Sequence, residues 1–223
     1  MLEKNIYDFL NQLKLNNNRD WFKKNKSLHD ESRFAVTQFA EALFLSLKNE
    51  NHLDKAKVFR IYRDVRFSKN KTPYKTHFAI GFHRIKPQFR GGYYLHLEPD
   101  NSFIATGFWN PEKDDLLRIR KEIEADHEYF KKITEYPDLL EKWGPLKGET
   151  LKSAPKGFDK EHPGIELLRH KQFIYSKRIK DNAVLKSDFE HWITEQFKAV
   201  QPFLNYMGDV LTTDLNGESI LKI

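Results

Sequence analysis

Residues 78–109 read FAIGFHRIKPQFRGGYYLHLEPDNSFIATGFW. Two stretches of this segment, at 78–83 and 93–98, alternate apolar with polar or small side chains, and a third at 102–109 follows the turn signal Pro99-Asp100-Asn101 and predicts a further strand. A period of two residues is that of a β-strand with one face in a core. The connections between the stretches are short and contain Gly, Pro, Asp and Asn, which favour turns. Because short connections join antiparallel neighbours, the sequence predicts an antiparallel meander rather than a βαβ arrangement.

The preceding residues 59–67 show the same alternation and predict one more strand. The apolar face would hold Phe59, Ile61, Val65 and Phe67, and the polar face Arg60, Tyr62, Asp64 and Arg66. Arg63 interrupts the apolar face. Residues 70–73 predict a loop, because Pro73 lacks a backbone N–H and disfavours helix at the residue before it. A short apolar stretch at 173–175 is a candidate for a further strand, so the expected sheet is four- or five-stranded.

Helical periodicity flanks the predicted sheet on both sides along the chain. Apolar residues repeat at intervals of three and four within 3–14 and again within 34–47. Asn18 is expected to cap a helix between them, because its side chain can accept a backbone N–H of the first turn. On the C-terminal side, Asn110-Pro111 predicts the start of the first of several further helices.

These elements are expected to form a single α+β domain over residues 1–223. Its parts are a helical region at 1–50, a sheet core at 56–109, and a helical and irregular region at 110–223. Hydrophobic residues make up 39% of the chain, which is enough for a sizeable core. Cysteine is absent, no apolar run approaches the ~20 residues of a membrane-spanning helix, and the first residues lack a signal-peptide pattern. We therefore expect a cytoplasmic protein with no membrane segment.

Positive charge is concentrated in one part of the chain. Eleven Lys and Arg residues lie between Lys55 and Arg90, with Asp64 as the single acid, so this part carries a net charge of +10 against +6 for the whole chain. A local excess of this kind favours an anion-binding surface. The alternative is that several of these side chains pair with acids on the flanking helices.

The residues from Arg60 to Lys75 are the main candidates for a functional site. Guanidinium groups bind phosphate or carboxylate through two parallel hydrogen bonds. The predicted ligand-binding residues are Arg60, Tyr62, Arg63, Arg66, Lys69, Lys71, Tyr74 and Lys75. Asp64 would orient the arginines or act as a base, and it is the one candidate for a catalytic role. The predicted ligand is a phosphorylated small molecule or a nucleotide.

Two other interpretations of this segment stay open. Aromatic side chains alternate with basic ones here, as in proteins that hold single-stranded nucleic acid, so the segment is also a candidate nucleic-acid-binding module. Alternatively, the Arg and Asp side chains form a structural ion-pair network that binds no ligand. No nucleophile elbow, P-loop or dinucleotide pattern is present, so the sequence identifies no reaction and no cofactor.

The sequence contains no familiar metal-binding motif. His77 and His83 are six residues apart, about 20 Å along a strand, which is too far for one ion. A metal site would have to combine separate elements, such as Asp64 with His77, or His96 with Glu98. We therefore assign no metal ligand from the sequence.

A family resemblance covers nearly the whole chain. Residues 60–75, RIYRDVRFSKNKTPYK, closely resemble the signature of a widespread microbial family, domain of unknown function 2461. The supporting motifs are Asn18–Phe22, Gly92–Glu98, Trp109–Pro111 with Ile119-Arg120, and Pro155–Phe158 before His162-Pro163. The resemblance implies a single domain that spans most of the chain and usually stands alone in the cytoplasm. It implies no activity, because the family has none assigned.

Overall fold

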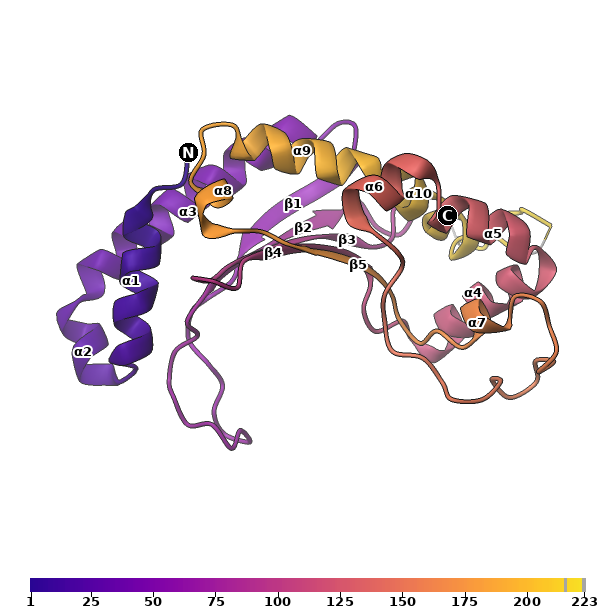
Figure 1. The fold of residues 1–223 in the computed structure, drawn as a ribbon, viewed down its shortest axis with the longest axis horizontal. Helices are drawn as coiled ribbons and strands as arrows, with labels where there is room; N and C mark the ends of the chain where they lie inside the picture. The colour runs from indigo at the N-terminus through magenta and orange to yellow at the C-terminus, as the bar shows by residue number, and fades with distance from the viewer. Residues whose placement is uncertain (215, 222–223) are drawn as a thin grey trace. The chain divides into compact units, whose positions relative to one another are not determined.

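The computed structural model of the protein describes residues 1–214 and 216–221. Its sheet has five antiparallel strands in the order β1-β2-β3-β4-β5 (Figure 1). The strands are β1 (Leu53–Val58), β2 (Phe78–Arg84), β3 (Gly92–Leu97), β4 (Phe103–Phe108) and β5 (Phe173–Arg178). Strands that follow one another in the sequence are neighbours in the sheet, so the predicted α+β meander is confirmed.

Helices come before β1, between β4 and β5, and after β5. They are α1 (Lys4–Leu15), α2 (Arg19–Lys24), α3 (Lys26–Leu47), α4 (Lys113–Ala125), α5 (His127–Thr134), α6 (Pro137–Trp143), α7 (Ile165–Leu168), α8 (Asp181–Val184), α9 (Phe189–Ala199) and α10 (Gln201–Val210). Among the residues that the structure describes, no helix has the length and apolar character needed to cross a membrane.

Two predicted helix starts have different outcomes. The side chain of Asn18 accepts a hydrogen bond from the backbone N–H of Trp21 at 2.9 Å, so the predicted cap of α2 is confirmed. The helix predicted to start at Pro111 begins instead at Lys113, with Glu112 at the N-cap. The Asn-Pro pair lies in the chain that leads into α4.

Two compact units can be distinguished in the chain. The first comprises residues 1–83, 94–104 and 178–194, and the second comprises 84–93, 105–177 and 195–223. The first unit contains α1 to α3, and the second contains α4 to α7 and α10. Strands β2 to β5 each contribute residues to both units. A single domain over the whole chain stays a prediction.

The core of the first unit lies between the N-terminal helices and the sheet. Helix α1 buries Ile6, Phe9, Leu10 and Leu13 on one face. The ring of Phe9 lies 6.1 Å from that of Phe78 at the start of β2, and α3 packs against both α1 and β1. Each fully buried side chain of this size contributes about 1.5–3 kcal/mol, so the apolar stripe of α1 holds the helix in place.

Aromatic side chains fill the core of the second unit. Four phenylalanines are fully buried there, namely Phe130, Phe173, Phe197 and Phe203. The hydroxyl of Tyr175 donates to the carbonyl oxygen of Thr134 at 2.7 Å, and the indole N–H of Trp143 donates to that of Gln196 at 2.8 Å. The polar atoms of these large buried side chains are therefore satisfied, which is what burial of Tyr and Trp requires.

The strand predicted at residues 59–67 is wrong. The first strand ends at Val58, and residues 59–77 form a long loop that leaves the sheet and returns to it at β2 (Figure 1). The two arms of this 59–77 loop pair with each other: the N–H of Lys75 donates to the carbonyl oxygen of Ile61 at 2.8 Å, and the N–H of Arg63 to that of Pro73 at 2.9 Å.

The alternation in this loop does not reflect a strand with one face in a core. Ile61 is buried, but Phe67 is 97% exposed, because no element covers the far end of the loop. Apolar alternation alone does not show whether another element covers the apolar face. In this loop the two arms form backbone hydrogen bonds with each other over a few residues only.

Gly107 in β4 gives a test of how closely β4 and β5 are joined. Its φ is 114°, and an added Cβ would lie 2.2 Å from the carbonyl oxygen of Phe173 in β5. We expect Gly107→Ala to destabilise the protein through both backbone strain, about 1–2 kcal/mol, and the clash, about a further 1–3 kcal/mol. Urea unfolding measures the change.

The matched control is Gly144→Ala, which follows α6. Gly144 also has a positive φ, 73°, but nothing lies within 4 Å of its added Cβ. This variant should therefore show the strain without the clash. Equal losses of stability in the two variants would contradict the close approach of β4 and β5.

Candidate functional site

A cleft of about 470 Å³ opens between the 59–77 loop and the N-terminal helices. It is lined by Lys14, Asn17, Arg63, Asn70, Thr72, Tyr74, Lys75, Thr76 and His77. Lys14 lies in the last turn of α1 and Asn17 in the connection to α2, while the other seven belong to the loop. Among the described residues that line the cleft, three are Lys or Arg and none is Asp or Glu. The cleft is therefore a positively charged environment.

The side chain of Asn17 attaches the 59–77 loop to the helices. Its amide nitrogen donates to the carbonyl oxygen of Tyr74 at 3.0 Å, and its amide oxygen accepts from the N–H of Tyr74 at 3.1 Å. The ring of Tyr74 stacks on that of Phe22 in α2, with 4.0 Å between centroids. One amide side chain thus satisfies both backbone groups of a buried residue. These hydrogen bonds fix the loop wall of the cleft to the connection between α1 and α2.

The three cationic side chains of the cleft have no carboxylate partner among the residues that the structure describes. Arg63 is half-buried and donates to the hydroxyl of Thr72 at 2.8 Å, a neutral acceptor that in turn donates to the side chain of Asn70 at 2.8 Å. Within the described part of the chain, none of Lys14, Arg63 and Lys75 forms a salt bridge. A bound anion would pair with these cations.

The structure brings together only some of the residues predicted from the sequence. Arg63, Tyr74 and Lys75 line the cleft. The other predicted ligand-binding residues are exposed and do not line it, namely Arg60, Tyr62, Arg66, Lys69 and Lys71. Lys71 donates instead to the carbonyl oxygen of Val65 at 3.1 Å, so it stabilises the far end of the loop.

Asp64 lies outside the cleft and forms an ion pair with Arg66, with 2.6 Å between Oδ2 and Nη2. The side chains of the pair are 48% and 77% exposed, so this pair is not the core of a buried ionic network. Hydrogen bonds from the side chain and the backbone of Arg66 lower the pKa of Asp64. The carboxylate is therefore ionised and weakly basic, and the predicted shared face with Arg60 and Tyr62 is absent because there is no strand.

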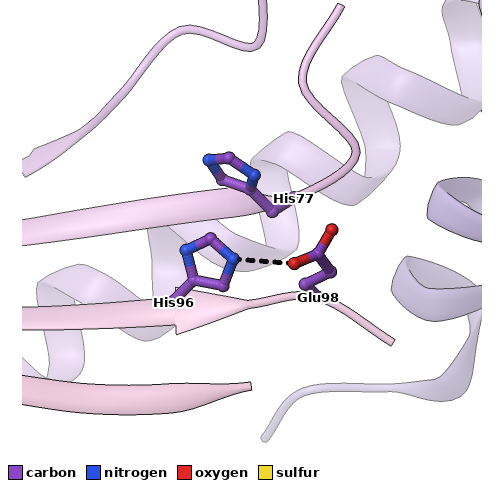
Figure 2. Close-up of side chains that lie close together, drawn as sticks. All are labelled: His77, His96 and Glu98. Carbon is purple, nitrogen blue, oxygen red and sulfur yellow. Dashed lines mark hydrogen bonds and ion pairs between the residues drawn. The ribbon is translucent and has the colours of Figure 1, made fainter. Parts of the chain in front are cut away.

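A cluster of two histidines and one glutamate adjoins the cleft (Figure 2). His77 directly precedes β2, while His96 and Glu98 are two residues apart at the end of β3, the strand next to β2. His96 Nε2 and Glu98 Oε2 are 3.2 Å apart, and the rings of His77 and His96 are 4.1 Å apart between centroids. We call these three residues the His/Glu cluster.

Burial sets the charge of the His/Glu cluster. Burial, together with the charges of His96, Lys75 and Arg63, lowers the pKa of His77 to about 4, although Glu98 opposes this. Burial also lowers the pKa of His96, although Glu98 opposes this.

Burial alone would raise the pKa of Glu98. Hydrogen bonds from Asn101, His96 and Thr76 together outweigh that effect and lower it. The cluster therefore holds two neutral imidazoles and one ionised carboxylate at neutral pH.

Sequence reasoning missed two parts of this site. Lys14 and Asn17 come from the helical region, and no pattern in the sequence connects them with residues almost sixty positions later. The sequence offers His96 with Glu98 as one of two candidate pairs for a metal site. Their spacing of two residues on a predicted strand indicates that their side chains lie on the same side. The third member, His77, lies near them because β2 and β3 are neighbours in the sheet.

The protein has an α+β fold, and three Lys or Arg side chains line a cleft at the 59–77 loop. A family model described as "Conserved hypothetical protein (DUF2461)" matches residues 5–206. The chain belongs to this family, so the resemblance of residues 60–75 is confirmed. No curated protein and no solved structure matches the chain.

Replacement of Asn17 tests its role in building the cleft. Asn17→Ala removes two hydrogen bonds and leaves both backbone groups of Tyr74 without a partner. We expect a loss of about 1–3 kcal/mol in the free energy of unfolding. Limited proteolysis should also cut faster within the 59–77 loop, because the loop is released from the helices.

Asn16→Ala is the matched control for this change. The amide nitrogen of Asn16 donates to the carbonyl oxygen of Gln12 within the same exposed turn. Its loss should leave both the unfolding curve and the cleavage rate near those of the unmodified protein. Similar effects of the two substitutions would show that Asn17 has no special role.

Proposed function

We propose that the cleft binds a phosphate-bearing small molecule such as a nucleotide. The observation that carries this proposal is the set of three cationic side chains, Lys14, Arg63 and Lys75, that face one cleft without an ion-pair partner in the described part of the chain. A phosphate monoester carries a charge of about −1.5 to −2 at neutral pH, which matches this excess better than a single carboxylate does.

The neutral side chains around the cations support the same assignment. The guanidinium of Arg63 is held by Thr72, so its planar fork is oriented before a ligand arrives. Thr76 and Asn70 also line the cleft and add polar groups. The volume, about 470 Å³, is within the roughly 300–1,000 Å³ of small-molecule sites.

A cytoplasmic location is part of this proposal. The chain contains no cysteine, which agrees with a reducing compartment. Phosphorylated metabolites and nucleotides would be available there.

Binding of inorganic phosphate and of adenosine monophosphate to metal-free protein tests the proposal. The protein is treated with EDTA and titrated by calorimetry. We expect Arg63→Gln and Lys75→Gln each to weaken binding by about 10- to 100-fold, since a hydrogen bond to a charged group contributes about 1.5–3 kcal/mol.

Arg60→Gln provides the matched control, because Arg60 is an exposed arginine of the same loop that does not line the cleft. It should leave the affinity unchanged. If the protein binds neither ligand at millimolar concentration, or if all three variants lose affinity equally, the cleft is not the site.

Nucleic acid is the second candidate ligand, and a different observation favours it. Phe67 is 97% exposed at the far end of the 59–77 loop, beside the exposed side chains of Arg66 and Lys69. Exposed aromatic and basic side chains together are suited to stack and neutralise a single strand.

Fluorescence anisotropy with a labelled single-stranded oligonucleotide tests this second candidate. We expect affinity to fall steeply with salt, and Phe67→Ala to weaken binding, because stacking contributes about 1–3 kcal/mol per base. Arg63→Gln, a change within the cleft, should not affect it. If the affinity does not depend on salt, or if Phe67→Ala leaves it unchanged, nucleic acid is excluded as the ligand of this loop.

A further inference from the structure

The His/Glu cluster has the composition and spacing of a metal site. One ligand atom from each of His77, His96 and Glu98 can be chosen so that all three lie within 4.8 Å of one another. The three side chains come from the residue before β2 and from the C-terminal end of β3, the neighbouring strand, and Figure 2 shows them gathered at one place beside the sheet. Residues two apart on a strand face the same side, which is why His96 and Glu98 point together.

We propose that His77, His96 and Glu98 bind one divalent first-row transition metal ion. Metal–ligand bonds of about 2.0–2.2 Å in a tetrahedral site place ligand atoms roughly 3.4 Å apart. His96 Nε2 and Glu98 Oε2 are already 3.2 Å apart. Small side-chain rotations of His77 would complete the three-coordinate set.

The residues around the cluster are those that a metal site needs in its outer shell. The hydroxyl of Tyr94 lies 3.1 Å from His96 Nδ1. With Nε2 bound to a metal, Nδ1 would carry the proton and donate a hydrogen bond to the hydroxyl oxygen of Tyr94. Glu98 accepts a hydrogen bond from the hydroxyl of Thr76 at 3.0 Å and another from the side chain of Asn101 at 2.6 Å. Such partners fix the orientation of metal ligands.

A structural hydrogen-bond network explains less of this arrangement. It accounts for the contact between His96 and Glu98, and for the stacking of His96 on Phe103 at 4.6 Å between centroids. It does not account for His77, whose ring nitrogens form no hydrogen bond with any residue that the structure describes. A shared cation would explain why a half-buried imidazole lies beside a second imidazole and a carboxylate.

The ligand set also indicates the kind of metal. Imidazole nitrogen suits Zn²⁺, Fe²⁺ and their neighbours, whereas Mg²⁺ and Ca²⁺ prefer oxygen ligands. Three protein ligands leave at least one coordination position open, as in catalytic zinc sites. Because His77 also lines the cleft, that position would be accessible to a bound phosphate oxygen. Only this last point rests on the proposed function.

Titration of EDTA-treated, dialysed protein with ZnCl₂ in phosphate-free buffer tests the metal site. Calorimetry should show one Zn²⁺ bound per chain, and excess Mg²⁺ should not displace it. We expect His77→Gln and Glu98→Gln to weaken Zn²⁺ binding by at least about 100-fold, because each removes a direct ligand, and Tyr94→Phe to weaken it by about 10- to 100-fold. The visible spectrum of the Co²⁺ form should change in the same variants.

His127→Gln is the matched control. His127 Nε2 lies 3.1 Å from a carboxylate oxygen of Glu128, so it belongs to another His–carboxylate contact. This variant should bind Zn²⁺ like the unmodified protein. Circular dichroism shows whether each variant folds. If Glu98→Gln does not fold, the Zn²⁺ affinity of His77→Gln alone tests the proposal, because His77 forms no hydrogen bond with a described residue.

Three results would overturn the proposal: no stoichiometric Zn²⁺ binding, unchanged binding in His77→Gln, or equal loss in His127→Gln. Because this titration contains no phosphate and the phosphate titration contains no metal, failure of one proposal is separate from failure of the other.

Discussion

The cleft depends on two hydrogen bonds made by one side chain. Asn17 binds both backbone groups of Tyr74, as a neighbouring strand would, and so attaches a loop that otherwise pairs with itself at only a few residues. The stacking of Tyr74 on Phe22 adds an apolar contact at the same point. Asn17 lines the cleft together with Lys14, Arg63 and Lys75, so this attachment belongs to the wall that carries the cations.

The site separates two kinds of electrostatic environment within a short distance. Cations that form no salt bridge with a described residue line the cleft, whereas the adjoining His/Glu cluster holds neutral imidazoles and a carboxylate supported by hydrogen bonds. His77 belongs to both, because it lines the cleft and contacts His96. A phosphate and a metal ion would stabilise each other in such an arrangement, since each supplies the charge that the other needs.

The success and failure of the strand predictions have one cause. The strands predicted at 78–83, 93–98 and 102–109 were correct because each stretch has a hydrogen-bonded neighbour in the sheet and buries apolar side chains. The alternation at 59–67 is interrupted only by Arg63, but those residues leave the sheet, and the side chain of Phe67 is exposed to solvent. Periodicity reports a side-chain pattern and contains no information about the partner surface.

The sequence by itself determined the fold class, the order of the meander, the cap at Asn18 and the location of the basic segment, because these depend on local patterns and on short connections. Tertiary structure decided which charges meet. It excluded Asp64 from the cleft, added Lys14 and Asn17, and joined His77 to His96 and Glu98. These groupings depend on contacts between residues far apart in the chain, and such contacts form only when the helices and strands pack together.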